Sequence, residues 1–239
     1  MKFAIIAAGE GSRLSHEGAA VPKPLVKIGG ETMIGRLLRI FQENGAGEIV
    51  VIANTLNLQT ADYIKSLIVR KHWDNIRLIV KSTPSSMHSF YELSPYLQDA
   101  PFCLTTVDTI FRESEFKRYI QAFRQFRGDA LMGVTDYVDD EKPLYVGTDD
   151  ALNITGFHDL NEGDKYISGG IYCMHPTAIP VLHRCIDSGV SRMRNFQRAL
   201  VDSGLHLKAW PFSKVIDVDH VSDIKKAETF VESSNAEGL

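Results

Sequence analysis

A glycine-rich loop directly follows the first apolar run of the chain, and its residue types suit a phosphate. Gly9-Glu10-Gly11-Ser12-Arg13 comes at the end of the run Phe3–Ala8. Glycines can adopt positive φ and let backbone N–H groups approach an anion closely. In an open α/β sheet, ligands bind beyond the carboxyl ends of strands, where this loop would lie. A Gly-x-Gly pair on its own also fits a tight turn.

Two common phosphate-binding loops do not match this stretch. The dinucleotide fingerprint has a third glycine where this chain has Leu14. It also has an acidic residue after the second strand, where this chain reads Ile52-Ala53-Asn54-Thr55. The P-loop ends in Gly-Lys-Ser or Gly-Lys-Thr, which is absent here. The loop therefore belongs to neither class.

A lysine between two prolines follows ten residues after Arg13. Pro22 and Pro24 keep the backbone around Lys23 extended and remove two N–H donors, which fixes the direction of the side chain. A lysine held beside a phosphate loop is suited to neutralising charge on a transferring phosphoryl group. We therefore predict that Arg13 and Lys23 are catalytic residues of one anionic site. The alternative for Lys23 alone is an exposed surface lysine.

The two motifs together resemble the signature of the sugar nucleotidyltransferase (NDP-sugar pyrophosphorylase) family. They read Ala7-Ala8-Gly9-Glu10-Gly11-Ser12-Arg13-Leu14 and Pro22-Lys23-Pro24-Leu25. The resemblance implies a Rossmann-like three-layer α/β/α fold of glycosyltransferase-A type, with a mixed, mostly parallel sheet. It also implies transfer of a nucleoside monophosphate from an NTP to a sugar 1-phosphate, with release of pyrophosphate. Arg13 would bind the outer phosphates and Lys23 the α-phosphate, with Ala8, Gly9, Gly11 and Ser12 contacting the nucleotide.

Aspartates at strand ends are the expected metal ligands of such an enzyme. Mg²⁺ binds carboxylate oxygens together with substrate phosphates rather than a closed protein cage. Asp108 ends the apolar run Phe102–Val107, a position where the family binds metal, although the neighbouring glycine of the family pattern is absent. Asp217 and Asp219 lie in a segment that resembles the family's closing strand, and strand spacing puts them on one face. All three are candidate ligands for Mg²⁺ or Mn²⁺, with Asp217 and Asp219 as alternatives.

Two more segments carry candidate binding residues. Ser85, Ser86 and Ser89 lead into a helix after the third predicted strand, where they can either cap that helix or contact the nucleotide. Ser168-Gly169-Gly170 interrupts an apolar strand, which indicates a bulge or the close approach of a ligand. The resemblance places the serine loop beside the base and the glycine segment in the acceptor pocket.

The predicted chemistry is in-line attack by an acceptor phosphate oxygen on the α-phosphorus. It needs no general base, because the phosphate is already ionised, and rests on positioning and electrostatics. The expected partners are an NTP and a phosphorylated small-molecule acceptor, without nucleic acid or membrane, and a homodimer is a candidate assembly. One alternative is a cytidylyltransferase for a non-sugar phosphate such as phosphocholine. Another is a catalytically silent nucleotide-sensing domain of the same fold.

Alternating apolar and amphipathic segments must position these residues. Helices are predicted through Met33–Phe41, with a stop signal at Asn44-Gly45, and from about Ser114. This alternation predicts an α/β fold with a parallel sheet covered on both faces. The runs predicted as buried strands are Phe3–Ala8, Ile49–Ala53, Ile76–Val80, Phe102–Val107 and Ala130–Thr135.

The second half is less regular. We expect one domain over residues 1–239, with a nucleotide-binding part at about 1–135 and an acceptor-side part at about 136–239. Its predicted helices lie at about 177–188, 193–202 and 221–231. Its predicted strands are Tyr145–Val146, Ile154–His158, Tyr166–Met174, Leu205–Trp210 and Val215–Val218.

Composition and charge narrow the class of protein further. The net charge of −4 argues against nucleic-acid binding. Residues 1–40 carry a local charge of +3, which suits an anionic ligand, whereas residues 129–164 carry −9. The acidic segment is most simply a solvated loop region, with a cationic acceptor as the alternative. The three cysteines are expected to be buried free thiols, and no run has membrane length, so we expect a cytoplasmic protein.

Overall fold

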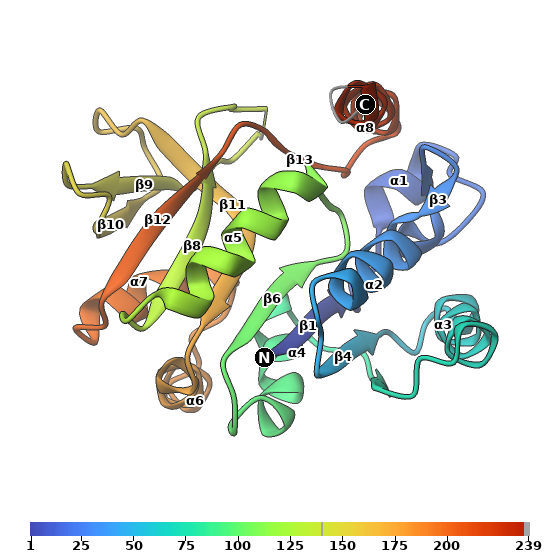
Figure 1. The fold of residues 1–239 in the computed structure, drawn as a ribbon, viewed down its shortest axis with the longest axis horizontal. Helices are drawn as coiled ribbons and strands as arrows, with labels where there is room; N and C mark the ends of the chain where they lie inside the picture. The colour runs from blue at the N-terminus through green and yellow to red at the C-terminus, as the bar shows by residue number, and fades with distance from the viewer. Residues whose placement is uncertain (140, 237–239) are drawn as a thin grey trace.

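Four parallel strands form one half of the central sheet in the computed structural model, which describes residues 1–139 and 141–236 (Figure 1). Strand β1 (Lys2–Ala7) lies between β4 (Glu48–Ala53) and β6 (Phe102–Thr106), and β5 (Ile76–Val80) forms the edge beyond β4. All four run in the same direction. The loops that follow them therefore meet at one edge of the sheet, where an open α/β sheet binds its ligands.

The other half of the same nine-stranded sheet is mixed. Strand β11 (Tyr166–Met174) runs antiparallel to both β6 and β8 (Ala130–Thr135), and β12 (Leu207–Phe212) lies parallel to β8. A hairpin of β9 (Tyr145–Thr148) and β10 (Ile154–His158) pairs with the start of β11. The sheet is thus mixed and mostly parallel around β1, as predicted.

Two short ladders stand outside the main sheet. Strands β2 (Lys27–Ile28) and β3 (Glu31–Thr32) pair after the Lys23 segment. Strands β7 (Thr109–Phe111) and β13 (Val215–Asp217) pair antiparallel, with Asp217 opposite Thr109. The second ladder brings the late aspartates to the end of β6, far from them in the sequence.

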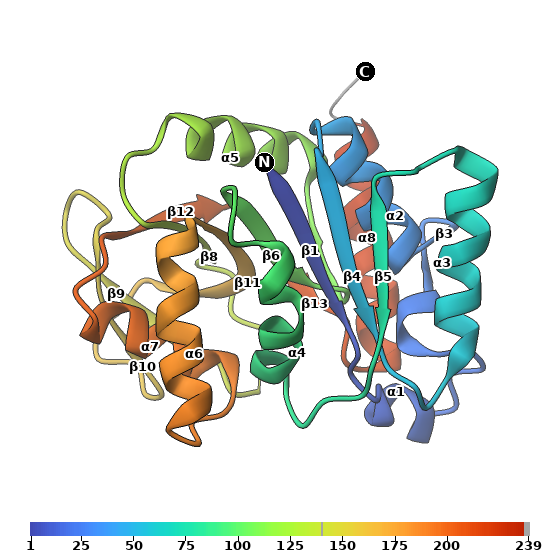
Figure 2. The same cartoon turned by 90° about the horizontal axis from the view of Figure 1, so that it is seen from below.

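Helices cover both faces of the sheet, which gives three layers (Figure 2). Residues of β1 alternate between two cores: Phe3, Ile5 and Ala7 face one, and Ala4 and Ile6 face the other. The first core is closed by α2 (Met33–Glu43), α3 (Leu58–Lys71), α5 (Glu113–Gln125) and α8 (Val221–Ala236). The second is closed by α4 (Ser86–Leu93), α6 (Ile179–Asp187) and α7 (Met193–Asp202).

Helix α2 shows how local sequence sets these boundaries. The Thr32 hydroxyl accepts a hydrogen bond from the Gly35 N–H at 3.1 Å, which caps the first turn. The helix ends at Asn44, and Gly45 has a positive φ of 72°, a conformation that costs glycine little. Between these ends, the apolar face packs into the first core beside Phe116 of α5, and the Phe41 and Phe116 rings stack 5.7 Å apart. The helix predicted from the sequence is confirmed.

Several boundaries differ from the sequence prediction for physical reasons. The strand predicted from Leu205 begins at Leu207, because the Leu205 N–H bonds the Leu200 carbonyl and closes the end of α7. The helix predicted from about residue 177 begins at Ile179, after a 3-10 turn over Pro176–Ala178. No helix of the described residues is long and apolar enough to cross a membrane. The three cysteines are buried and free, as expected.

Candidate active site

The glycine-rich loop lies at the carboxyl end of β1 and opens the short helix α1 (Ser12–His16). Gly11 has a φ of 62°, and a Cβ at this position would lie 2.8 Å from the Cβ of Lys23. The missing side chain therefore lets the Lys23 segment lie directly against the loop. From the other side, the Asn54 side chain after β4 donates to the Gly9 carbonyl at 3.0 Å. The loop is held between these two segments.

A chain of alternating charges crosses the edge of the sheet beside this loop. The Lys23 ammonium forms ion pairs with Asp108 and with Asp219, the latter at 2.6 Å. The second oxygen of Asp219 lies 2.7 Å from a guanidinium nitrogen of Arg13. The Lys23 side chain is only 11% exposed, so it does not behave as the free surface lysine of the alternative reading. The order Arg13, Asp219, Lys23, Asp108 joins both ends of the sequence in one cluster.

These charges set the protonation states of the buried pair. Burial disfavours the ammonium form, but the carboxylates of Asp108 and Asp219 outweigh it and raise the pKa of Lys23 above its ordinary value. Burial also favours the neutral form of Asp108, yet the nearby ammonium of Lys23 prevails and lowers the pKa of Asp108. Both groups are therefore charged at neutral pH.

Asp108 has one oxygen that suits a cation. Its Oδ1 is buried and has no hydrogen-bond partner among the described residues, although buried polar atoms are normally paired. In the part of the chain that the structure describes, no group of three or more His, Cys, Asp or Glu side chains could hold a metal ion alone. Mg²⁺ commonly takes one or two carboxylates and completes its shell with water and substrate phosphates. The oxygen donors of Asp108 and Asp219 fit that mode and the chemistry of Mg²⁺ or Mn²⁺.

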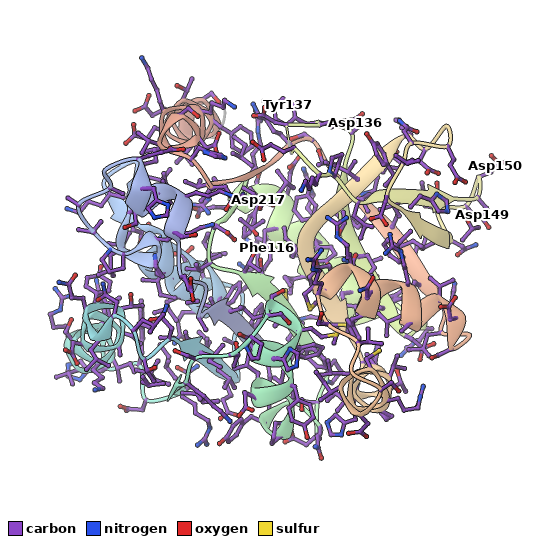
Figure 3. The ribbon with its side chains drawn as sticks, turned by 180° about the vertical axis from the view of Figure 1, so that it is seen from behind. Phe116, Asp136, Tyr137, Asp149, Asp150 and Asp217 are labelled. Atoms are coloured by element: carbon purple, nitrogen blue, oxygen red, sulfur yellow. The ribbon has the colours of Figure 1, made fainter. Side chains whose placement is uncertain are left out.

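The two late aspartates do not lie in the same place. Asp219 contacts Lys23 and Arg13. Asp217, which Figure 3 labels, is instead paired with Thr109 in the ladder of β13 and β7. Strand β13 ends at Asp217, and the Val218 N–H bonds the Asp108 carbonyl at 3.1 Å. The strand periodicity that would put both aspartates on one face therefore stops between them.

A cleft of about 460 Å³ opens over the glycine-rich loop, and we call it the loop cleft. It brings together every residue predicted to bind the nucleotide and most of those predicted for catalysis and metal binding. They are Ala8, Gly9, Gly11, Ser12, Arg13, Lys23, Ser85, Ser86, Ser89, Asp108 and Asp219. Thr83 and Thr106 also line it and were not predicted, because a single threonine at the end of a strand or after it carries no distinctive signal.

The serine loop serves the helix as well as the cleft. Ser85 caps α4, and its hydroxyl accepts a hydrogen bond from the His88 N–H at 3.5 Å. Ser89 is buried, and its hydroxyl lies 2.6 Å from that of Thr83. Ser85 therefore caps the helix and also lines the loop cleft.

A second cleft of about 350 Å³ lies beside the β11 bulge, and we call it the bulge cleft. Ser168, Gly169 and Asp217 line it, and it shares Arg13 and Asp219 with the loop cleft. Gly170 does not line it. A Cβ at Gly170, whose φ is 70°, would lie 3.2 Å from the Thr109 hydroxyl, so this glycine permits close packing of β11 on β7.

Part of the acidic segment lines the bulge cleft. Asp139 and Glu141 lie at its wall together with Tyr137, and Asp139 forms a 2.8 Å ion pair with Lys226 of α8. Asp149 and Asp150 are exposed on the turn between β9 and β10, at the right-hand edge of the molecule in Figure 3, whereas Tyr137 lies at its top. Asp136, Asp139 and Glu141 are exposed as well, so the prediction of a solvated acidic segment also holds there, and two of these residues line the bulge cleft.

The comparisons with known proteins place the chain in a family. Residues 3–202 match the MobA-like NTP transferase domain. The glucose-1-phosphate cytidylyltransferase of Salmonella typhimurium (strain LT2) is 22% identical over 209 residues, covering 76% of this chain and 78% of that protein. A "probable glucose-1-phosphate cytidylyltransferase" of Bacillus subtilis (strain 168) is 27% identical over 158 residues, or 66% of this chain. The chain spans about half, 54%, of that second relative.

A solved structure shows the same fold. The inositol-1-phosphate CTP transferase from T. maritima superposes with a TM-score of 0.77 at 19% identity, covering 96% of this chain and 97% of that one. The domain match includes the glycine-rich loop, Lys23, Asp108 and the β11 bulge. The domain match covers most of the chain, and the solved structure has the same fold. The chain therefore belongs to the family of MobA-like NTP transferase domains.

Proposed function

We propose that the protein is a cytoplasmic nucleotidyltransferase that transfers a nucleoside monophosphate from an NTP to a sugar 1-phosphate, with Mg²⁺ or Mn²⁺. The observation that carries the proposal is the position of Lys23, which lies largely buried between Asp108 and Asp219 at the wall of the loop cleft. An anionic substrate and a divalent cation would both find their partners there.

The reaction needs few protein groups. An acceptor phosphate oxygen forms a bond to the α-phosphorus while the bond from that phosphorus to the bridging oxygen breaks, and pyrophosphate leaves with the electron pair. Lys23 would neutralise charge at the α-phosphate, and Arg13 would bind the outer phosphates after exchanging its contact with Asp219. Asp108 and Asp219 would hold the cation, which when bound supplies charge neutralisation at the phosphate oxygens.

The two clefts suggest how the substrates are arranged. The loop cleft would hold the nucleotide, with Ser85 and Ser86 toward the base, and the bulge cleft would hold the acceptor against Ser168 and Gly169. Arg13 and Asp219 line both clefts, so the α-phosphate and the attacking phosphate would meet beside them. Positioning of this kind can supply much of a rate enhancement without a covalent intermediate.

A second candidate acceptor carries a positive charge, as phosphocholine does. The lining of the bulge cleft favours it, because its acidic side chains outnumber its basic ones, and Lys226 is already paired with Asp139 and Asp223. The acidic residues that line this cleft are Asp139, Glu141, Asp217, Asp219 and Asp223. A cationic headgroup would be attracted by this lining.

A pyrophosphate-release assay tests both candidates. The purified protein with Mg²⁺ is given each of ATP, CTP, GTP, UTP and dTTP in combination with glucose 1-phosphate, inositol 1-phosphate and phosphocholine. Turnover with a sugar phosphate supports the main proposal, and turnover with phosphocholine alone supports the second candidate. Tight NTP binding without turnover of any pair would contradict both and leave the nucleotide-sensing domain.

A further inference from the structure

A buried glutamine on α7 holds two residues of the β11 bulge at once. Gln197 is 2% exposed. Its side-chain oxygen accepts a hydrogen bond from the Ser168 hydroxyl at 2.9 Å, and its nitrogen donates to the Tyr172 hydroxyl at 3.4 Å. Neither the glycine-rich loop nor the metal candidates contact it through these bonds, so the reaction chemistry does not account for its position.

The bulge brings Ser168 and Tyr172 within reach of one amide. Ser168 pairs with Val134 of β8 and Tyr172 with Met132, so four steps along β11 correspond to only two along β8. A regular strand would separate residues four apart by about 13 Å, against about 7 Å for two steps. The extra residues of β11, among them Gly169 and Gly170, form the bulge between Ser168 and Tyr172.

The hydrogen bond to Gln197 also decides what Ser168 can offer a ligand. A serine hydroxyl has one proton and two lone pairs. The proton is donated to Gln197, and the Tyr172 hydroxyl also lies within hydrogen-bond reach of Ser168, which leaves one lone pair of Ser168 for the bulge cleft that it lines. Burial, together with the negative charges of Asp217 and Asp108, raises the pKa of Tyr172 to about 12, so the phenol stays neutral beside the amide.

We propose that Gln197 is a positioning residue for acceptor recognition: it fixes the Ser168 hydroxyl so that Ser168 accepts a hydrogen bond from a hydroxyl or ammonium group of the acceptor. The inference rests on the proposed function, because it presumes that the bulge cleft binds the acceptor. It assigns Gln197 to the binding of the acceptor, without a part in binding the NTP or the cation.

The test compares Gln197→Met with the wild-type protein in steady-state pyrophosphate release. Methionine fills a similar volume and makes neither hydrogen bond. The KM for the acceptor should rise about three- to tenfold, the range expected for one lost hydrogen bond. The KM for the NTP and the Mg²⁺ concentration at half-maximal rate should stay within about twofold of wild type. Ser168→Ala should likewise raise the KM for the acceptor and leave the KM for the NTP unchanged. The KM for the acceptor of the double variant should be no higher than that of the more impaired single variant.

Two further variants separate positioning from folding. Gln197→Glu retains an oxygen that accepts from Ser168 and should recover most of the acceptor affinity. Gln42→Met removes a remote amide pair with Asn75, just before β5 and at the opposite edge of the sheet, and should leave both KM values unchanged. Equal changes in both KM values, no change in either, or additive single variants would overturn the inference. If the wild-type protein turns over no acceptor at all, the proposed function itself is wrong. If the wild-type protein is active and only the Gln197 results differ from expectation, the inference alone is wrong.

Discussion

The two clefts of this molecule are built in different ways. The loop cleft lies at the ends of the parallel strands β1 and β6, and most of its lining comes from short loops that follow strands. The bulge cleft is assembled from β8, β11, β13, the loop around Tyr137 and the start of α8, which are distant in the sequence. The loops that follow parallel strands meet at one edge of the sheet, so the backbone alone forms much of the loop cleft. The shape of the bulge cleft depends instead on individual side chains from several elements. We therefore expect changes in the loop cleft to alter rate and changes in the bulge cleft to alter acceptor choice.

The largest expected effect is that of Lys23→Ala, which removes the cation from between two carboxylates. The kcat should fall by about 10²- to 10³-fold, because the charge developing at the α-phosphate loses its nearest donor. Lys27→Ala is the matched control, since Lys27 is an exposed lysine of the same segment and should retain normal turnover. Normal turnover by the Lys23 variant in a pyrophosphate-release assay would show that changes in the loop cleft do not control the rate.

The paired aspartates test the boundary between the clefts. Asp219→Asn should lower kcat/KM by about a hundredfold and raise the Mg²⁺ concentration needed for half-maximal rate, because Asp219 contacts Lys23 and Arg13. Asp217→Asn should leave the Mg²⁺ dependence unchanged and alter the KM for the acceptor, since Asp217 lines only the bulge cleft. Titrating Mg²⁺ at fixed NTP measures the difference. Identical Mg²⁺ curves for the two variants would show that the clefts are not separate.

Two glycine substitutions separate backbone strain from site geometry. Gly11→Ala and Gly18→Ala both put a Cβ on a residue with positive φ, 62° and 89°, and each should cost about 1–2 kcal/mol of unfolding free energy. Only at Gly11 does the new Cβ meet Lys23, at 2.8 Å, whereas nothing lies within 4 Å at Gly18. Gly11→Ala should therefore also raise the KM for the NTP. Thermal unfolding and steady-state kinetics on both variants decide this, and equal KM values would refute it.

The smallest effect is expected at a charge network outside both clefts. Hydrogen bonds from Arg39 lower the pKa of Glu113, against the effect of burial and with help from Arg36. The ionised group therefore stabilises the fold above its ordinary pKa, and the contribution disappears as the pH falls through the lowered value. Glu113 is 39% exposed and screened by water, so Glu113→Gln should cost about 1 kcal/mol or less at pH 7.

Melting curves at several pH values check the Glu113 prediction. The difference in Tm between wild type and Glu113→Gln should be about 2–4 °C or less at pH 7 and shrink as the pH falls below 4.5, the ordinary pKa of glutamate. Activity of the variant at pH 7 should be normal. A Tm difference that is constant with pH, or a loss of turnover, would mean that this network is linked to the clefts.

Strands β1, β4, β6 and β8 were predictable because they are buried on both faces and read as continuous apolar runs. All four were predicted to within one residue at each end, and so was β5, although it is a partly exposed edge strand. Helix α3 was not predicted, since it buries only four residues and exposes Leu58 and Val69. The three-residue strand β7 was missed because it exists only through its pairing with β13.

The site divides in the same manner. Arg13, Lys23 and Asp108 could be found because they stand next to a loop, two prolines and an apolar run. The different positions of Asp217 and Asp219 could not be predicted, because they depend on where β13 ends, and a contact with Asp108 sets that point. Tyr137, His220 and Lys226 carry no local signal, since a helix start or a polar loop beside a cleft looks like any solvated surface. Only the tertiary fold shows that they share a wall.

The ion pairs of Asp219 also bear on the order in which the protein is made. Asp219 follows Lys23 by 196 positions, a length that a ribosome adds in about ten to forty seconds. During that time Lys23 has no carboxylate partner until Asp108 is added and then only Asp108, and Arg13 lacks its carboxylate. A nascent or broken chain that lacks α8 and the residues just before it would have the glycine-rich loop but not the complete charge cluster. We therefore expect an unfinished chain to be unable to consume nucleotide, however well its first half has folded.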